Sequence, residues 1–318
     1  MIVSITHELD LDGLGSQAII KRYFDHSLNI NKRKIILHYA HYSNFIGKIR
    51  EILNAEQLPD QLIISDIGFN DDFKTLFSLF EQSKLKSIKI LWFDHHLIDE
   101  NYKDDLEKLL EVYLNDPNRC SAEIVKDYYL PNDSIANIIA KFSRDIDFHT
   151  KIYLTASNLQ SIIAFNRESE SDEIKRKIVD LLSIGKLDDN WFDEQLVKIK
   201  EWEKEQTQFA LDHIIVIDID DFGKILISFA KLGGGKIVSI LKSQFSEIKV
   251  YLGIDIRYNE IIIHSDYVNC REFARKFKGG GHRNRAGFKF DNIFTKNYEI
   301  NQDFVQQIKI SIQKFKIN

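Results

Sequence analysis

Short apolar runs alternate with amphipathic stretches through the first half of the chain. The runs at 2–5, 34–40, 61–67 and 88–93 are typical of buried strands, and the stretch at 44–53 carries apolar side chains at helical spacing. Strands that alternate with helices usually form a mostly parallel sheet that is covered on both faces. The pattern therefore predicts an α/β domain over residues 1–150.

The pattern changes twice in the second half. Residues 151–212 have amphipathic helical spacing and become polar on most faces near 201–208, which predicts a helical linker. From residue 213 onward, short strand patterns return and alternate with short helices. Residues 213–318 are therefore expected to form a second, smaller α/β domain with a mixed sheet, so that the chain has two lobes.

Length and composition narrow the class of protein. The chain has 318 residues, and single cores usually stop growing at about 250 residues. A net charge of −5 argues against a protein that holds long duplex nucleic acid, and favours a small phosphorylated substrate. Cys120 and Cys270 lie far apart, which fits a reducing compartment and disfavours disulfides or a zinc–thiolate site. Without a basic leader or an apolar run of about 18 residues, the protein is expected to be cytoplasmic, with no membrane partner.

Acidic and imidazole side chains follow three of the predicted strands. They are His7, Asp10, Asp12, Asp66, Asp94, His95 and His96. The carboxyl ends of parallel strands share one edge of a sheet, where ligands bind. Oxygen and nitrogen donors suit Mn²⁺, Co²⁺ or Fe²⁺, and a carboxylate between two ions about 3.5–4 Å apart is the usual plan of two-metal hydrolases. These residues are therefore candidate metal ligands.

Each of these segments also has a simpler interpretation. Asp12 or Ser16 could cap a helix, and Asp66 alone would be a turn or capping residue. If a loop must aim two carboxylates inward, Gly13 and Gly15 can supply unusual backbone dihedrals. The case for a metal site comes from the combination of segments.

A last pair of carboxylates, Asp145 and Asp147, follows a predicted helix at 135–142. One of them could complete the shell of a second ion. The local pattern at 143–149 alone favours a polar loop at the end of the helix, and it does not distinguish the two carboxylates.

Three consecutive glycines at 279–281 precede a basic segment. Such a segment can be a flexible turn or a backbone nest whose N–H groups hold an anion. Arginine forks match phosphate oxygens. The candidate substrate-binding residues here are Gly280, Gly281, His282, Arg283, Arg285 and Arg271.

Together these segments resemble the DHH phosphoesterases over nearly the whole chain. The signature segments match at His7-Asp10-Asp12-Gly13, at Asp66, at Asp94-His95-His96, and at Asp145 or Asp147. The Gly-Gly-Gly-His segment resembles the substrate-binding motif of the DHH-associated domain. The resemblance implies a catalytic DHH domain over 1–150, a linker over 151–212 and a DHH-associated domain over 213–318.

The resemblance also implies roles for individual residues. One metal ion would bind His7, Asp10 and Asp66, and the other would bind Asp12, Asp66, His95 and the last aspartate. The expected ions are Mn²⁺, with Mg²⁺ or Co²⁺ as alternatives. In the catalytic group, Asp94 would orient His95 and His96 would face the phosphate.

The function that the resemblance implies is two-metal hydrolysis of short oligoribonucleotides or linear dinucleotides to mononucleotides. 3′-Phosphoadenosine 5′-phosphate is a related substrate. A RecJ-like exonuclease on single-stranded DNA is the alternative enzyme, which the net charge and the lack of room for an OB-type domain disfavour. An inorganic pyrophosphatase would not need the glycine segment. The non-enzymatic alternative is a nucleotide-binding sensor, although six polar residues in one crevice argue against it. The resemblance does not determine the substrate length or the cleavage polarity, and both a monomer and a homodimer are compatible with it.

Overall fold

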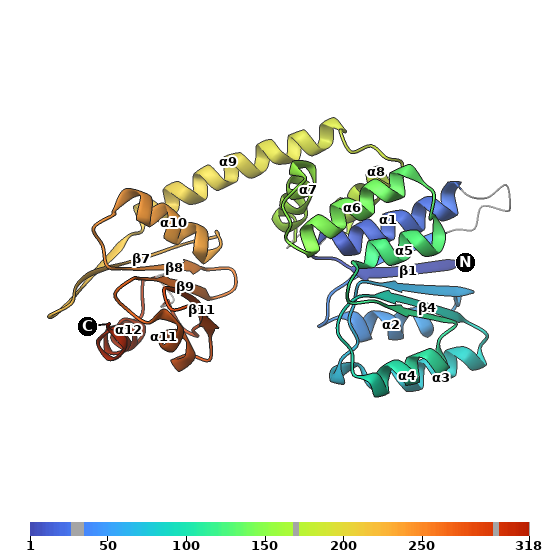
Figure 1. Cartoon of the computed structure of the whole chain (residues 1–318), viewed down its shortest axis with the longest axis horizontal. Helices are drawn as coiled ribbons and strands as arrows, with labels where there is room; N and C mark the ends of the chain where they lie inside the picture. The colour runs from blue at the N-terminus through green and yellow to red at the C-terminus, as the bar shows by residue number, and fades with distance from the viewer. Residues whose placement is uncertain (27–34, 168–171, 295–298, 318) are drawn as a thin grey trace. The chain divides into compact units, whose positions relative to one another are not determined.

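The structure is a computed structural model, in which the described part of the chain forms two compact units. The described residues are 1–26, 35–167, 172–294 and 299–317. The first unit is Met1–Ile199 and the second is Lys200–Asn318 (Figure 1). Each unit has its own apolar core. Among the described residues, no helix is both long enough and apolar enough to cross a membrane.

The division between the units falls within α9 (Asn190–Asp212). The sequence pattern predicts boundaries after residues 150 and 212 instead. The difference has a physical reason, because α7 (Leu154–Phe165) and α8 (Glu173–Ser183) bury apolar side chains in the core of the first unit. Most of the expected linker therefore packs with the N-terminal sheet.

A parallel sheet forms the centre of the first unit. Its strands are β1 (Ile2–His7), β2 (Ile35–Ala40), β3 (Gln61–Ser65), β4 (Lys89–Asp94) and β5 (Val112–Asn115). They pair in parallel in the order β2-β1-β3-β4-β5. The predicted parallel sheet is thus confirmed. β5 has no counterpart among the predicted strands, and residue 34, the expected start of the second strand, lies outside the described residues.

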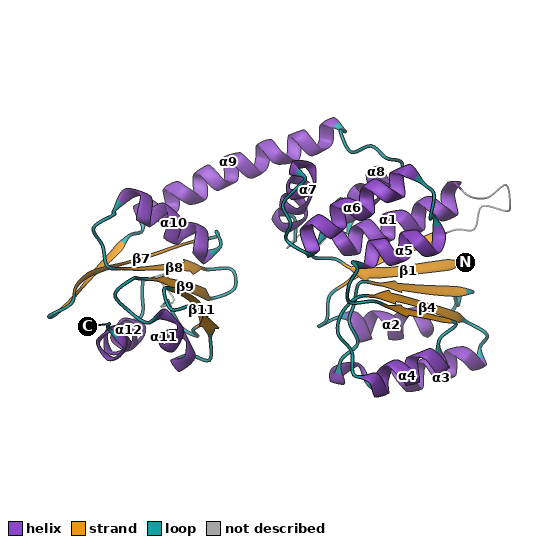
Figure 2. Cartoon of the chain, viewed as in Figure 1, coloured by secondary structure: helices purple, strands orange, loops and turns teal. Residues whose placement is uncertain are grey.

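Helices cover both faces of this sheet (Figures 1 and 2). One face carries α1 (Leu11–His26), α5 (Ser121–Tyr129), α6 (Ser134–Asp147), α7 and α8. The other carries α2 (Phe45–Leu53), α3 (Leu76–Leu85) and α4 (Glu100–Leu109), with a short 3₁₀ turn at Asp71–Phe73. Because both faces are buried, the strands are nearly continuous apolar runs.

The strand order determines where a crevice opens. β1 and β3 are neighbours, but the chain leaves β1 to form β2 on one side before it crosses to β3 on the other. The connections after β1 and β3 therefore diverge, which opens a crevice at the carboxyl ends of these strands. His7 ends β1 and Asp66 directly follows β3, so both residues lie at this crevice.

The second unit contains a mixed sheet. Its strands are β6 (Ile215–Ile219), β7 (Gly223–Ala230), β8 (Val250–Asp255), β9 (Glu260–His264), β10 (Gly280–Gly281) and β11 (Arg285–Lys289), in the order β10-β11-β9-β8-β7-β6. β7 and β8 pair in parallel, and the other neighbours are antiparallel. The expected mixed sheet is confirmed.

Helices also cover both faces of the second sheet. α10 (Gly234–Gln244) packs on one face, and α11 (Cys270–Lys276) and α12 (Gln302–Phe315) pack on the other (Figure 1). α12 has no counterpart among the predicted elements.

Candidate metal centre

A first group of possible ligand atoms lies at the ends of β1 and β3. His7 Nδ1 is 3.0 Å from Asp10 Oδ2 and 3.6 Å from Asp66 Oδ2. The ligand atoms of these three residues all lie within 4.8 Å of one another. The structure thus brings Asp66 to the segment that carries His7 and Asp10.

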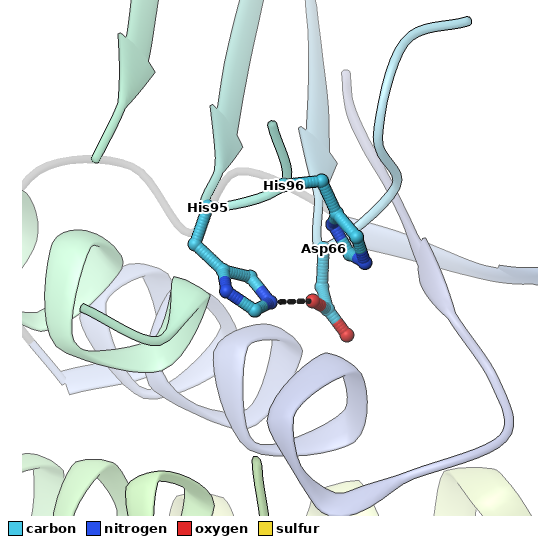
Figure 3. Close-up of side chains that lie close together, drawn as sticks. All are labelled: Asp66, His95 and His96. Carbon is cyan, nitrogen blue, oxygen red and sulfur yellow. Dashed lines mark ion pairs between the residues drawn. The ribbon is translucent and has the colours of Figure 1, made fainter. Parts of the chain in front are cut away.

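A second group forms around His95, which follows β4. His95 Nε2 is 3.8 Å from Asp12 Oδ2 and 3.4 Å from Asp66 Oδ1, and His95 Nδ1 is 3.5 Å from Asp147 Oδ2. Figure 3 shows the His95 ring directed at the Asp66 carboxylate, with His96 beside it. Asp66 therefore presents one oxygen to His95 and the other to His7, so its carboxylate is placed to be shared by both groups.

The chemistry of these donors fits divalent ions. Four carboxylates, those of Asp10, Asp12, Asp66 and Asp147, gather around the imidazole of His95 and that of His7. Oxygen and nitrogen donors without a thiolate suit Mn²⁺, Mg²⁺ or Co²⁺ better than a structural zinc ion. The excess of negative charge in a partly buried crevice also favours bound cations.

Asp66 combines burial with an unusual backbone conformation. Its φ is +58°, in the left-handed region that strains residues other than glycine. Its exposed fraction is 2%, and Ser121 Oγ donates a hydrogen bond to its Oδ1 atom at 3.2 Å. Strained backbone persists only where the surrounding structure enforces it, and it concentrates at functional sites.

Asp12 lies in the first turn of α1, whereas the sequence predicts a loop there. Its carboxylate accepts hydrogen bonds from the backbone N–H groups of Ser121 (2.7 Å) and Ala122 (2.9 Å), at the start of α5. The partial positive charge at a helix N-terminus stabilises a carboxylate. The buried Asp12 side chain is thus fixed by α5 before any ion binds.

The expectation that Gly13 and Gly15 supply unusual dihedrals is wrong, because neither has a positive φ. Both glycines instead permit close packing. A Cβ atom at Gly13 would lie 2.1 Å from the carbonyl oxygen of His7, and one at Gly15 would lie 2.5 Å from Ser143 Oγ. Glycine is needed here for space between α1, β1 and α6.

The structure separates the two candidates at the end of α6. The Asp147 carboxylate faces His95. The Asp145 carboxylate is buried and accepts hydrogen bonds from the N–H groups of Ile152 (2.7 Å) and Tyr153 (3.0 Å), and from the Thr150 hydroxyl. Asp145 therefore fixes the turn into α7, and only Asp147 of this pair joins the ligand groups.

The expectation that Asp94 orients His95 is wrong in the structure. Asp94 Oδ1 lies 2.8 Å from His96 Nδ1, and Asp94 Oδ2 accepts a hydrogen bond from the His96 N–H at 3.2 Å. Asn115 donates a hydrogen bond to the His96 carbonyl oxygen at 2.9 Å. The buried Asp94 thus orients His96, and His95 is oriented by Asp66 and Asp147.

The charges of the crevice raise the pKa values of its histidines. Burial disfavours the charged form of His7, but Asp10 and Asp66 outweigh this and raise its pKa to about 10. Burial opposes the charged form of His95 in the same way, and Asp66 and Asp12 raise its pKa to about 9. For Asp12, burial and then the Asp66 charge raise the pKa well above its usual range. Bound cations would take the place of these protons.

A cavity of about 360 Å³ adjoins the ligand groups. Its lining includes Ile146, His149, Gln160 and Arg167 as well as His7, Asp10, Asp12 and Asp147. None of the first four residues is predicted from the sequence. His149 has a φ of +55° and lies just beyond the end of α6. Its place two residues after Asp147 is the one sequence signal that could have identified it.

The glycine-rich segment of the second unit forms a hairpin between β10 and β11. The His282 N–H donates a hydrogen bond to the Arg285 carbonyl oxygen at 2.7 Å, so this N–H is not available to an anion. Arg271 Nε donates to the Gly281 carbonyl oxygen at 2.9 Å, and Gly281 has a φ of +141°, which requires glycine. The side chains of Arg271, His282, Arg283 and Arg285 are exposed, and Gly280 and Gly281 form the strand beside them.

Comparisons with known proteins bear on the family and the fold of this chain. The model of the DHH family, N-terminal domain, matches residues 1–186. A 3′,5′-cyclic-nucleotide phosphodiesterase of Helicobacter pylori is 22% identical, with 95% of this chain and 96% of that protein covered. Among solved structures, the pGpG-specific phosphodiesterase PggH of Vibrio cholerae has a TM-score of 0.52 at 12% identity, covering 99% of this chain and 98% of that one. At that identity the likeness shows the fold alone.

Proposed function

The chain belongs to the DHH family of phosphoesterases, and we propose that it is a metal-dependent phosphodiesterase that hydrolyses short oligoribonucleotides or linear dinucleotides to mononucleotides. One observation carries the proposal: the Asp66 carboxylate presents one oxygen to the group around His7 and the other to the group around His95. A shared carboxylate of this kind is the central feature of two-metal hydrolases.

The proposed ligands follow from the two groups. One ion would bind His7, Asp10 and Asp66, and the other would bind Asp12, Asp66, His95 and Asp147. We propose Mn²⁺ as the native ion, with Mg²⁺ and Co²⁺ as alternatives. Two bound ions would supply Lewis-acid activation of the phosphate and a water of lowered pKa.

The protein's own groups would orient the substrate. His96, held by Asp94, lies beside Asp66 (Figure 3). Among the described residues, no group forms a hydrogen bond with its second ring nitrogen, which can face a phosphate oxygen. Its pKa is raised to about 9, since Asp94 outweighs the opposing effect of burial. In the metal-free protein this pairing favours the protonated imidazole, a donor that can stabilise negative charge on the phosphate.

Charge and cavity size support a small substrate with phosphate groups. The cavity of about 360 Å³ is within the lower range of small-molecule sites. Arg167 and His149 in its lining can bind a further phosphate or a base. In the second unit, we propose that Arg271, Arg283, Arg285 and His282 bind phosphate or a base of the substrate, together with the backbone at 280–281.

A second candidate substrate is a 3′,5′-cyclic nucleotide. The Helicobacter pylori relative with that activity in its name is similar over 95% of this chain. Cyclic nucleotides, linear dinucleotides and short RNA all contain a phosphodiester of a nucleoside, so one metal centre could act on each. Arg167 favours a substrate with a phosphate beyond the scissile one, which a 3′,5′-cyclic mononucleotide lacks.

The test is a Mn²⁺-supported hydrolysis assay on a substrate panel. The panel contains 5′-labelled RNA from dinucleotide to long oligomer, matched single-stranded DNA, 3′-phosphoadenosine 5′-phosphate and 3′,5′-cyclic adenosine monophosphate. We expect the highest kcat/KM on the shortest RNAs, with mononucleotide products. Processive cleavage of long DNA would favour a repair exonuclease, preference for the cyclic nucleotide would favour the second candidate, and binding without hydrolysis would favour a nucleotide sensor.

A further inference from the structure

Tyr42 lies at the rim of the candidate metal centre. It follows β2, at the same edge of the sheet as the ligands that follow β1, β3 and β4. Its ring makes edge contacts with the rings of His7 and His96, with centroid distances of 6.1 Å and 6.3 Å. The Tyr42 side chain is partly accessible, with an exposed fraction of 38%. The Tyr42 side chain can therefore contact a phosphate group that binds next to His7 and His96.

The Tyr42 hydroxyl has a fixed acceptor role. The Gly68 N–H donates a hydrogen bond to Tyr42 Oη at 3.0 Å. A phenol has one proton to donate as well as lone pairs to accept, so its own proton points away from this amide. Within the described ranges, no group accepts that proton in a hydrogen bond. Among the described residues, the hydroxyl is thus a donor without a partner, and its ring lies beside that of His96.

Gly68 makes this arrangement possible. A Cβ atom at Gly68 would lie 2.7 Å from the Cβ of His96 and 3.1 Å from Tyr42 Oη. Any side chain at this position would push His96 or Tyr42 away from the Gly68 backbone. The absence of a side chain therefore sets the spacing between the two candidate phosphate donors.

The ring and the turn that carry the hydroxyl are fixed. The ring of Tyr42 stacks on that of Phe73, with centroids 5.8 Å apart and planes at 16°. Phe73 is buried in the core that also contains Phe45. The turn is closed by Asn44, whose side-chain oxygen accepts a hydrogen bond from the His41 N–H at 3.0 Å. Little ordering of this donor is needed when a substrate binds.

We propose that the Tyr42 hydroxyl donates a hydrogen bond to a non-bridging oxygen of the scissile phosphate, an inference that rests on the proposed phosphodiesterase function. A donor that is positioned before the reaction stabilises charge as it grows on the phosphate oxygens. Tyr42 is also a neutral donor, so it adds this hydrogen bond without changing the charge of the crevice. Its role would be catalytic and distinct from metal binding.

The experiment compares the wild-type protein with Tyr42→Phe, which keeps the ring on Phe73 and removes only the hydroxyl. Both are loaded with Mn²⁺, and kcat and KM are measured on linear diadenylate and on bis(p-nitrophenyl) phosphate. We expect kcat to fall by about 100- to 1000-fold on both substrates, the size of loss typical of one lost donor to a developing charge. Mn²⁺ affinity, measured by calorimetry, should not change. The matched control is Tyr102→Phe, whose hydroxyl contacts Asp71 and whose loss should leave kcat unchanged.

The outcomes separate this inference from the proposed function. An active wild-type protein with an equally active Tyr42→Phe variant would overturn the inference alone and leave the ring as a stacking surface. A loss of kcat that disappears at saturating Mn²⁺ would also overturn it, because the hydroxyl would then act through the metal. A wild-type protein that is inactive on both diesters would overturn the proposed function and this inference with it.

Discussion

Binding of metal ions to the candidate centre should release protons. In the metal-free protein, the pKa of His7 is about 10, where Asp10 and Asp66 outweigh the opposing effect of burial. The pKa of His95 is about 9, because Asp66 and Asp12 outweigh burial in the same way. An imidazole coordinates a metal ion only in its deprotonated form. Each ion must therefore displace a proton from its histidine.

These pKa values set the size of the effect. At pH 7 both imidazoles are almost fully protonated, so filling both positions should release at least about two protons. The apparent affinity for each ion should rise about tenfold per pH unit between neutral pH and pH of about 9. The stability of the metal-free protein has the opposite trend. Because the folded-state pKa of each histidine lies above the ordinary value of 6.5, protonation stabilises the folded protein, and this contribution is fully present below pH 6.5. It is lost as the pH rises through about 9 to 10.

Calorimetric titration of Mn²⁺ into the metal-free protein at pH 7 measures this release. Repeating the titration in buffers of different protonation enthalpy gives the number of protons as a slope. His7→Asn should reduce the number of protons released by about one and weaken the binding of one ion. His213→Asn, in the second unit, is the control and should change neither quantity. A release near zero at pH 7, with affinity independent of pH, would refute the role of His7 and His95 as ligands.

Four substitutions test other parts of the account. Gly13→Ala should destabilise the protein by about 1–3 kcal/mol in thermal unfolding and weaken Mn²⁺ binding, because the new Cβ would lie 2.1 Å from the His7 carbonyl oxygen; unchanged stability would contradict this packing. Asp147→Asn should weaken Mn²⁺ binding in calorimetry with little loss of stability. Asp145→Asn should instead lower the free energy of unfolding by about 1–2 kcal/mol and leave Mn²⁺ affinity intact. The reverse result would exchange the roles of the two residues. Arg283→Ala should raise KM for linear diadenylate and leave that for bis(p-nitrophenyl) phosphate unchanged, and an equal effect on both would place Arg283 outside substrate recognition.

The sequence was most informative where burial and chemistry change abruptly. β1, β3 and β4 are continuous apolar runs because helices cover both faces of their sheet, and each run ends at a polar residue of the centre. The same rule of strand ends could have identified Tyr42, which follows β2. The parallel sheet and the gathering of residues at its edge therefore follow from local pattern together with topology.

Tertiary contacts decided the features that the sequence could not reveal. The helix α6 continues to Asp147, beyond the predicted end at 142. In this extension, Ser143 Oγ donates a hydrogen bond to the Leu11 carbonyl oxygen at 3.1 Å. Within a helix, residues two apart point about 200° apart around the axis, so Asp145 and Asp147 face different surroundings. The pairing of Asp94 with His96 is local, but Asn115 at the end of β5 supports it with a hydrogen bond to the His96 carbonyl oxygen.

The shared position of Asp66 is the central claim, and the most direct test is the number of Mn²⁺ ions bound alongside turnover in wild-type protein and in Asp66→Ala. The wild-type protein should bind two ions and hydrolyse linear diadenylate. Asp66→Ala should remain folded by circular dichroism, bind fewer ions and lose turnover, because both donor groups lose the same carboxylate. A folded Asp66→Ala protein that binds two Mn²⁺ ions and keeps full turnover would contradict the account.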